Sequence, residues 1–362
     1  MQTELQKIKR VIGVGGIGAG ICFALEGAHD LRRNESRSAK LTESRDYCKL
    51  HIIMHYLGVL LKEAGSSVEI FPVGRVGKDA TGQRLVQEME TAGLNLSYVE
   101  QTDAPTLFSV CYQYPDKSGG NITSTNSAAA QLTASDVAAT RALFAEATYK
   151  SAALVVPEAP LATRRQLLAL ASEHSSFRAG SFTAAEMLKE ETAELIPQLD
   201  LIALNAEEAE AVSGASFDMS THISFLDRCA AVLTNAQPRI WIVVTGGENG
   251  AFGFDGKAWR HVPAVQTHVE STAGAGDALF AGVVTALLLG LPFIAEDGGT
   301  SVVDSALYFG SLLAAFSVTS PHTIHPHATW GSLYDFAKSA GVIFEPALFG
   351  DAARTGVAGR QM

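Results

Sequence analysis

The feature that most constrains the fold of this chain is an alternation of short apolar segments with longer segments of helical periodicity. Runs of apolar and β-branched residues predict strands at 11–14, 68–73, 153–156, 201–204 and 240–245. Apolar residues at helical spacing predict helices at 54–64, 81–92, 136–148, 161–173, 206–213, 225–236, 277–289 and 304–318. This pattern predicts an α/β fold, with a mainly parallel sheet and helices on both of its faces.

Two regions interrupt the alternation. Residues 32–49 are polar and charged, whereas residues 98–125 are rich in β-branched and aromatic side chains around a turn at 115–120. The second region predicts antiparallel strands joined by a hairpin. A small β element that projects from an α/β body commonly covers a cleft. We therefore expect a single domain over residues 1–362, with lid elements at about 30–50 and 98–126.

Composition excludes several classes of function. The net charge of −11 over 362 residues disfavours a nucleic-acid partner, although backbone amides could still bind a small anion. The longest apolar run, 278–289, is shorter than the about 20 residues that cross a bilayer, so no membrane partner is expected. The four cysteines, at 22, 48, 111 and 229, have neither disulfide-framework nor zinc-site spacing. These features predict a cytoplasmic protein.

The segment Gly274-Ala275-Gly276-Asp277 stands directly before an apolar helix. Amides at a helix start have no partner within the helix and favour negative charge, and glycine lets a phosphate come close. Asp277 could then take a proton from a hydroxyl that attacks the phosphate. The alternative is that Asp277 only caps the helix after a tight turn, and these residues alone do not separate the two interpretations.

Two further segments follow predicted strands. Asn205 and Glu208 could hold a hydrated Mg²⁺, but their spacing also fits a helix capping box. Thr245, Gly247 and Gly250 surround a glycine turn that could border a nucleotide, although an ordinary β-turn uses the same residues.

The order of these three segments resembles that of the ribokinase-like (PfkB) carbohydrate kinases. Gly77–Gly82, which contains Asp79, is similar to a Gly-x-Asp-x-x-Gly segment of that family, and 317–319 adds a weaker match. The resemblance, which runs from about residue 10 to 345, implies a ribokinase-like three-layer fold with a mainly parallel central sheet and a small β lid. It also implies a homodimer through the lid strands.

The resemblance further implies that the protein transfers the γ-phosphate of ATP to a hydroxyl of a sugar or sugar-like acceptor, nucleosides included. Asp277 would be the general base, and Gly274, Ala275 and Gly276 the anion hole. Asn205 and Glu208 would act on Mg²⁺ and the phosphates through water, and Thr245, Gly247 and Gly250 would border ATP. The predicted acceptor-binding residues are Gly15, Gly16, Arg45, Asp46 and Asp79.

The sequence departs from the family pattern at three places, which concern the monovalent cation and the acceptor. Ser271 stands where the family carries an Asp that orders a monovalent-cation loop, which puts potassium activation in doubt. The early sugar-binding Asp is not evident in 15–27, and a Gly-Gly-x-x-x-Asn signature is missing before the helix that ends near Gly65. Arg45–Lys49, His51 and His55 stand there instead, which suggests an altered acceptor site.

Other interpretations compete with the kinase. Gly13–Gly18 is a formal GxGxxG and, with a helix over 18–25 and Glu35 as its acid, would predict a dinucleotide-binding oxidoreductase. A non-catalytic sensor of a sugar or nucleotide would share the kinase fold. His51 and His55 lie four apart and could form a metal pair, but no third ligand is evident, so an ordinary polar helix face is the favoured interpretation. The histidines at 322, 325 and 327 favour a solvated loop.

Overall fold

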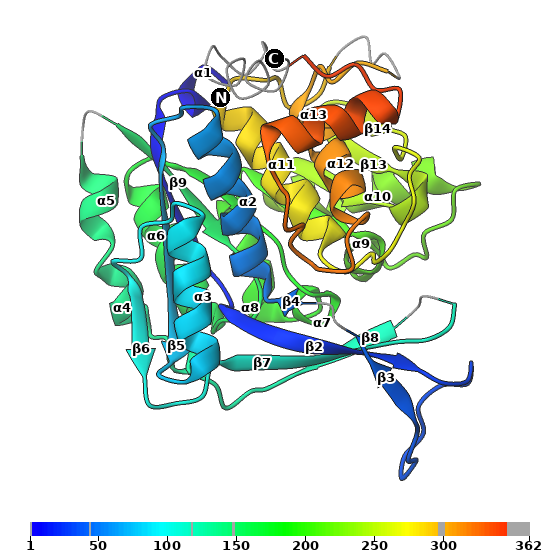
Figure 1. Cartoon of the computed structure of the whole chain (residues 1–362). Coiled ribbons are helices and arrows are strands. Elements are labelled where there is room, and N and C mark those ends of the chain that lie inside the picture. Colours follow the sequence, from blue (N-terminus) through cyan, green and yellow to red (C-terminus); the bar gives the residue numbers. More distant parts are fainter. Residues whose placement is uncertain (1, 43–44, 117–118, 147–148, 296–300, 346–362) are drawn as a thin grey trace, which may run out of the picture.

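The computed structural model describes residues 2–42, 45–116, 119–146, 149–295 and 301–345. Its central sheet has nine strands in the order β14-β13-β12-β11-β10-β9-β1-β5-β6 (Figure 1). These strands are β1 (Ile8–Val14), β5 (Glu69–Gly77), β6 (Val99–Thr102), β9 (Lys150–Val155), β10 (Phe177–Gly180), β11 (Leu201–Asn205), β12 (Trp241–Thr245), β13 (Ala251–Phe254) and β14 (Trp259–Val262). All neighbours from β12 to β6 are parallel, and only β13 and β14 pair antiparallel. The predicted α/β fold with a mainly parallel sheet is confirmed.

Helices cover both faces of this sheet. One apolar core packs under α2 (Lys49–Glu63), α3 (Ala80–Thr91), α11 (Ala275–Leu288), α12 (Ala306–Ser317) and α13 (Trp330–Ser339). The other packs under α4 (Ala134–Ala138), α5 (Arg141–Ala145), α6 (Leu161–Glu173), α9 (Ala206–Ser213) and α10 (His222–Ala236). Neighbouring residues of β1 point into different cores, Val11 into the first and Ile12 into the second, because side chains alternate along a strand. Shorter helices are α1 (Gln2–Leu5), α7 (Ala184–Met187) and α8 (Glu190–Ala193).

One predicted helix is divided. The single helix expected over 136–148 is replaced by α4 and α5, and residues 147–148 lie outside the described part of the chain. Thr140 lies between the two helices, and its buried hydroxyl donates to the carbonyl of Val137. A hydroxyl that bonds back to the preceding turn competes with the helical ladder, which accounts for the break. No helix in the described residues is long and apolar enough to span a bilayer.

A second sheet, here called the small sheet, projects from one end of the body (Figure 1). Its order is β3 (Ala39–Leu41), β2 (Gly18–Leu25), β7 (Leu107–Gln113) and β8 (Gly119–Thr123), and β4 (Asp46–Tyr47) also pairs with β2. The antiparallel pair β7 and β8 confirms the predicted hairpin. The expected lid boundaries need correction, however. Strand β6 belongs to the central sheet, and β2, which precedes residue 30, belongs to the small one.

The dinucleotide-binding interpretation is wrong, because Gly18–Leu25 forms strand β2 rather than a helix. A Cβ at Gly18 would lie 2.4 Å from the carbonyl oxygen of Leu107, so this glycine lets β2 and β7 approach closely. Glu35 lies in the connection between β2 and β3, where it accepts a hydrogen bond from the amide of Arg32 and pairs with Arg37. It is thus a loop residue rather than a ribose-binding acid at a strand end.

Helices α11 and α12 approach each other unusually closely. A Cβ at Gly282 would lie 2.7 Å from the Cα of Gly310, and a Cβ at Gly310 would lie 2.7 Å from the carbonyl oxygen of Leu279. Both helices are buried on nearly all sides. The first turn of α11, which carries Asp277, is therefore attached to a rigidly packed pair of helices.

Candidate active site

Most of the predicted site residues lie at one edge of the central sheet, beyond the carboxyl ends of its parallel strands. Asn205 ends β11 and Thr245 ends β12, and these two residues are opposite each other in register. Gly15 and Gly16 follow β1, which neighbours β9. Ligands of open α/β sheets bind at this edge.

Asp277 lies in the first turn of α11, but it does not cap that helix. The N-cap is Gly274, whose φ of 78° lies in the left-handed region that favours glycine. The carboxylate of Asp277 instead lies with Oδ1 3.5 Å from Nζ of Lys49, the first residue of α2. The side chain of Asp277 is 12% exposed. The capping alternative thus fails, and Asp277 is left with a charged partner from a distant part of the chain.

The charges around Lys49 are unbalanced. Burial raises the pKa of Asp277, and the nearby Lys49 partly opposes that effect. Asp277 in turn raises the pKa of Lys49 against the effect of burial, with smaller contributions from Glu208 and Glu158. Burial raises the pKa of Glu158 and raises that of Glu208 to about 7. One ammonium group is thus shared by three carboxyl groups.

The turn before α11 offers two backbone donors. The helical ladder begins where the amide of Ala278 donates to the carbonyl of Gly274 at 2.8 Å, so the amides of Gly276 and Asp277 have no partner within the helix. A Cβ added at Gly276 would meet no atom within 4 Å. The predicted contribution of Ala275 needs correction, because its amide already donates to the carbonyl of Thr272 at 3.2 Å.

Asn205 and Glu208 form a reciprocal capping box at the start of α9. The side chain of Asn205 accepts from the amide of Glu208 at 2.8 Å, and Glu208 Oε2 accepts from the amide of Asn205 at 2.9 Å. Glu208 is only 8% exposed. The capping box anticipated as an alternative is therefore present. It uses only Oε2 of this buried carboxyl group, whose charge interacts with that of Lys49.

The glycine turn after β12 has two different kinds of glycine. Gly250 has a φ of 85°, and a Cβ there would lie 2.1 Å from the carbonyl oxygen of Val262, so it serves the packing of the turn. Gly247 has a φ of 60°, and a Cβ there would meet no atom within 4 Å. Of the two, Gly247 leaves space for a ligand beside Thr245.

Asp46 joins the small sheet to the site. Its Oδ2 accepts hydrogen bonds from Oγ of Ser109 at 2.7 Å and from Sγ of Cys111 at 3.2 Å, both on β7. Its charge contributes to the raised pKa of Asp277, so the two carboxyl groups lie in one neighbourhood.

Arg45 is held by its backbone rather than by its side chain. Its amide donates to Nδ1 of His322 at 2.9 Å, and its carbonyl accepts from the amide of Thr323 at 3.1 Å. The guanidinium is 63% exposed and lies 3.8 Å from Oε1 of Glu88. The structure therefore ties Arg45 to the loop before α13 more strongly than to the neighbourhood of Asp277.

Two other predicted acceptor positions have structural contacts. The amide of Gly16 donates to the carbonyl of Pro157 at 3.0 Å, and a Cβ at Gly16 would lie 2.4 Å from that of Glu158. A Cβ at Gly15 would lie 2.2 Å from the side chain of Val156. These glycines let the chain after β1 lie against the chain after β9, and contact with an acceptor stays a prediction.

Asp79 is the N-cap of α3 and uses both carboxylate oxygens within the fold. Oδ1 accepts from the amide of Gly82 at 2.8 Å and from Oγ1 of Thr106 at 2.7 Å, while Oδ2 accepts from the amide of Thr106 at 2.8 Å. These contacts fix the chain that leads into β7, so they give Asp79 a structural part beside its predicted role in acceptor binding.

Two residues of the site, Lys49 and Glu158, were not named individually as site residues from the sequence. Glu158 Oε2 accepts from the amide of Lys49 at 3.0 Å, and its φ of 72° is unusual for a residue with a side chain. Glu158 could have been noticed as an acid just beyond the predicted strand at 153–156. Lys49 stands in the segment that replaces the family signature, but only the fold shows that it reaches Asp277.

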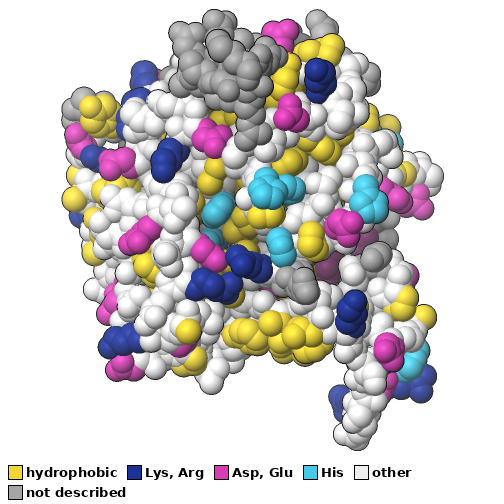
Figure 2. Space-filling view, in the orientation of Figure 1, with side chains coloured by type: hydrophobic (Ala, Val, Ile, Leu, Met, Phe, Trp, Pro, Cys, Tyr) yellow, Lys and Arg dark blue, Asp and Glu magenta, His cyan; other side chains and the backbone are white. Residues whose placement is uncertain are grey.

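Histidine side chains gather in the middle of the face shown in Figure 2, between α2 and the residues before α13. His51 is 1% exposed, and neither ring nitrogen has a partner among the described residues. His325 packs on Phe316 with ring centroids 4.0 Å apart. Within the described residues, no group of three or more His, Cys, Asp or Glu side chains could hold a metal ion.

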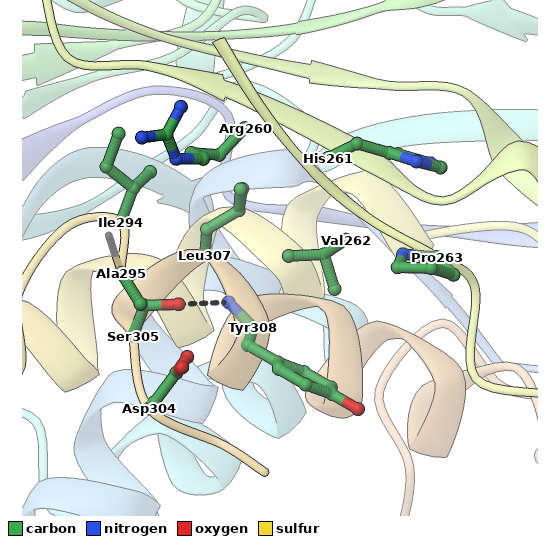
Figure 3. Close-up of a pocket in the computed structure, with 10 residues that line it drawn as sticks. All are labelled: Arg260, His261, Val262, Pro263, Ile294, Ala295, Asp304, Ser305, Leu307 and Tyr308. Atoms are coloured by element: carbon green, nitrogen blue, oxygen red, sulfur yellow. Dashed lines mark hydrogen bonds between the residues drawn. The ribbon is translucent and has the colours of Figure 1, made fainter. Parts of the chain in front are cut away.

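A separate small cavity lies between β14 and the start of α12 (Figure 3). It is lined by Arg260, His261, Val262, Pro263, Ile294, Ala295, Asp304, Ser305, Leu307 and Tyr308, and its volume is about 40 Å³. It contains none of the predicted site residues and is too small for a nucleotide or a sugar.

Comparisons with solved structures agree with this architecture. Ribokinase from Giardia lamblia is 17% identical with a TM-score of 0.71, over 91% of this chain and 99% of that one. Ribokinase from Arabidopsis thaliana, complexed with ribose and ATP, is 18% identical with a TM-score of 0.67, over 91% and 99%. Adenosine kinase from Sinorhizobium meliloti is 17% identical with a TM-score of 0.67, over 92% and 99%.

These similarities establish the ribokinase-like fold. No curated protein matches the chain in sequence. The model of the pfkB family carbohydrate kinases, however, matches residues 56–330, which include Asn205, Glu208, Thr245 and Asp277. On this match, together with the fold, the chain belongs to the pfkB carbohydrate kinase family.

Proposed function

We propose that this protein transfers the γ-phosphate of ATP to a hydroxyl group of an uncharged sugar or nucleoside, with Asp277 as the general base. The observation that carries the proposal is the placement of Asp277. Its carboxylate, in a side chain that is only 12% exposed, lies in the first turn of α11, beside two helix amides without intrahelical partners and 3.5 Å from Nζ of Lys49. A base needs a pKa near the working pH, and burial raises that of Asp277 from its ordinary value.

The residues around Asp277 and Glu208 fit a nucleoside triphosphate and a divalent cation. The amides of Gly276 and Asp277 and the open space at Gly276 would receive a phosphate. Glu208 would hold Mg²⁺ through water, beside Asn205, and Thr245 and Gly247 would border the nucleotide. When bound, the metal supplies positive charge to the phosphates. The loop at Ser271 gives no support for a monovalent-cation site.

The protein's own side chains would prepare the acceptor hydroxyl. The carboxylate of Asp277 would accept the hydroxyl proton as the oxygen attacks, and the helix amides would stabilise negative charge on the transferred group. Lys49 would hold Asp277 in place before the ligands bind and limit the rise of its pKa.

The charge of the site supports an uncharged acceptor. Asp46, Glu158 and Asp277 lie in one neighbourhood with a single ammonium group, that of Lys49, among their described contacts. Carboxylates accept hydrogen bonds from hydroxyl groups but repel phosphate and carboxylate groups. Sugars and nucleosides are therefore preferred over sugar phosphates and sugar acids, and Glu158 and Asp46 are the side chains that would bind their hydroxyls.

The small sheet supports the expected homodimer. Its strand registers place Leu41, Phe108 and Ile122 on the face that points away from Asp46, and these side chains are 55%, 41% and 67% exposed. Figure 2 shows hydrophobic side chains along β2 and β7. Light scattering of the wild type against Ile122→Glu tests this association, and a monomeric wild type would contradict it. A cytoplasmic location stays a prediction.

The decisive test is a screen for ATP-dependent phosphorylation over unphosphorylated sugars, nucleosides and their phosphates. The wild type should phosphorylate an uncharged acceptor, and Asp277→Asn should lower kcat by about 10²- to 10⁴-fold. Asp103→Asn, which changes an exposed aspartate in the same way, is the matched control. Full turnover in Asp277→Asn would contradict the assigned base. Binding of ATP and sugar without turnover in the wild type would favour the non-catalytic sensor.

A further inference from the structure

The fold brings together two cysteines that are far apart in the sequence. Cys22 on β2 and Cys111 on β7 are direct partners in the parallel register of the small sheet. Neighbouring strands lie about 4.8 Å apart, and residues in register point to the same face. That spacing lies within the Cα separations of about 4.4–6.8 Å that disulfides span. Both thiols are free and partly exposed.

This cysteine pair lies on the face of the small sheet that meets the proposed acceptor site. Cys111 donates its Sγ–H to Oδ2 of Asp46, and Ser109, two residues earlier on β7, donates to the same oxygen. A Cβ at Gly20, two residues before Cys22, would lie 2.4 Å from that oxygen. A chemical change at Cys111 therefore acts directly on Asp46.

We propose that Cys22 and Cys111 form a site of reversible oxidation, in which a peroxide converts the two thiols into a disulfide and thereby weakens acceptor binding at Asp46. In the first step Cys22 attacks the peroxide, the O–O bond breaks, and a sulfenic acid and one water or alcohol form. In the second step the Cys111 sulfur attacks the sulfenic sulfur, an S–S bond forms, the S–O bond breaks, and water leaves. The two sulfurs together lose the two electrons that the peroxide gains.

The order of the two steps follows from the surroundings of the thiols. Burial raises the pKa of the Cys111 thiol, and the charge of Asp46 raises it further, which keeps Cys111 protonated at neutral pH. Because the thiolate is the nucleophile in both steps, these effects slow attack by Cys111. The first attack on the peroxide is therefore assigned to Cys22, and Cys111 resolves the sulfenic acid more slowly, once its proton is lost. Once oxidised, Cys111 has no proton to donate, so Asp46 keeps only the Ser109 hydroxyl of these two donors.

The chemical part is tested on the full chain, independently of any kinase activity. The protein is treated with hydrogen peroxide, alkylated after denaturation, digested and analysed by mass spectrometry. We expect a cross-linked pair of peptides containing Cys22 and Cys111, loss of two of the four free thiols, and recovery with dithiothreitol. Cys22→Ser should abolish the cross-link, whereas Cys229→Ser should retain it. Full alkylation of Cys22 and Cys111 after peroxide treatment, or a cross-link through Cys48 instead, would overturn the proposal.

The consequence for binding rests on the proposed function. With an acceptor identified by the screen, oxidation should raise the KM for that acceptor by about 2- to 10-fold, because Asp46 loses the hydrogen bond from Cys111 that helps to position it. The KM for ATP should stay unchanged. Dithiothreitol should restore the acceptor KM, and Cys22→Ser should not respond. An unchanged acceptor KM in protein shown to be fully cross-linked would overturn this consequence. If no acceptor is phosphorylated, the kinase proposal fails and the mass-spectrometric result still decides on the disulfide.

Discussion

Around Asp277 the groups that would meet phosphates are glycines and backbone amides of one continuous segment. Around Asp46 the groups that would meet the acceptor, and those that hold them, are side chains from separate elements. Asp46 on β4 and Glu158 beyond β9 would bind the acceptor, and Ser109 on β7 holds Asp46. A binding surface made of backbone needs only a local sequence pattern. A surface made of side chains depends on how distant segments pack, so it can change while the chemistry stays the same.

The largest expected effect is a pH-dependent loss of stability caused by Glu208, which lies near Asp277 and Lys49. Burial raises its pKa from 4.5 to about 7, so the folded state holds a proton that the unfolded state releases. Its stabilising contribution is complete below pH 4.5 and is lost as the pH rises to about 7. Relative to Glu208→Gln, the free energy of unfolding of the wild type should therefore fall by about 3 kcal/mol over this range.

Urea unfolding at several pH values, without nucleotide, measures this difference. Glu207→Gln, an exposed neighbour on the same helix, is the matched control and should show no such pH dependence relative to the wild type. Parallel stability curves for the wild type and Glu208→Gln would show that burial at this position does not disfavour the charged form.

Gly276 tests the backbone-built region. Because a Cβ there meets no atom within 4 Å, Gly276→Ala should fold with unchanged stability but intrude on the phosphate position. A small displacement of the reacting groups lowers kcat/KM for ATP by about 10²-fold. Gly274→Ala is the contrasting variant. Gly274 has a φ of 78°, and an added Cβ would lie 2.8 Å from the carbonyl oxygen of Thr323, so this substitution should lower the unfolding free energy by about 1 kcal/mol or more. Normal ATP kinetics in Gly276→Ala would exclude this anion hole.

Asp46 tests the region built from side chains. Asp46→Asn should raise the acceptor KM by about 10-fold through loss of a charged hydrogen-bond acceptor, with little change in the KM for ATP. Arg45→Ala should have a smaller effect, because the Arg45 side chain is exposed and its backbone makes the contacts. Steady-state kinetics with both substrates distinguish them, and equal effects of the two variants would place Arg45 in the acceptor site as well.

Asp79 should give the smallest effect. Asp79→Ala removes the cap of α3 and should lower the unfolding free energy by about 1 kcal/mol, while the acceptor KM stays unchanged. Asp79→Asn keeps an oxygen that accepts from the amide of Gly82, so it should lower the unfolding free energy by less than Asp79→Ala does. A raised acceptor KM in Asp79→Asn, without a loss of stability, would support the predicted role of Asp79 in acceptor binding.

The sequence was informative wherever local rules decide the structure. Apolar periodicity predicted β1, β5, β9, β11 and β12 and most of the long helices, but it missed β10, β14 and α13. The small residues before α11 predicted the turn that precedes Asp277. Three things depended on long-range packing: the pairing of β2 with β7, the contact of Lys49 with Asp277, and the placement of β6 in the central sheet. Gly18 illustrates the limit, because a glycine required for close strand packing has the same spacing as one that binds a dinucleotide.

The contact between Gly282 and Gly310 has a consequence for how the protein could be altered. Any larger residue at either position would push α11 and α12 apart and displace the turn that carries Asp277. The residues on the face of the small sheet that meets the proposed acceptor site, Cys22, Asp46 and Ser109, have no such constraint from the two helices. Directed evolution toward a new acceptor should therefore accumulate substitutions in the small sheet and reject them along this helix pair.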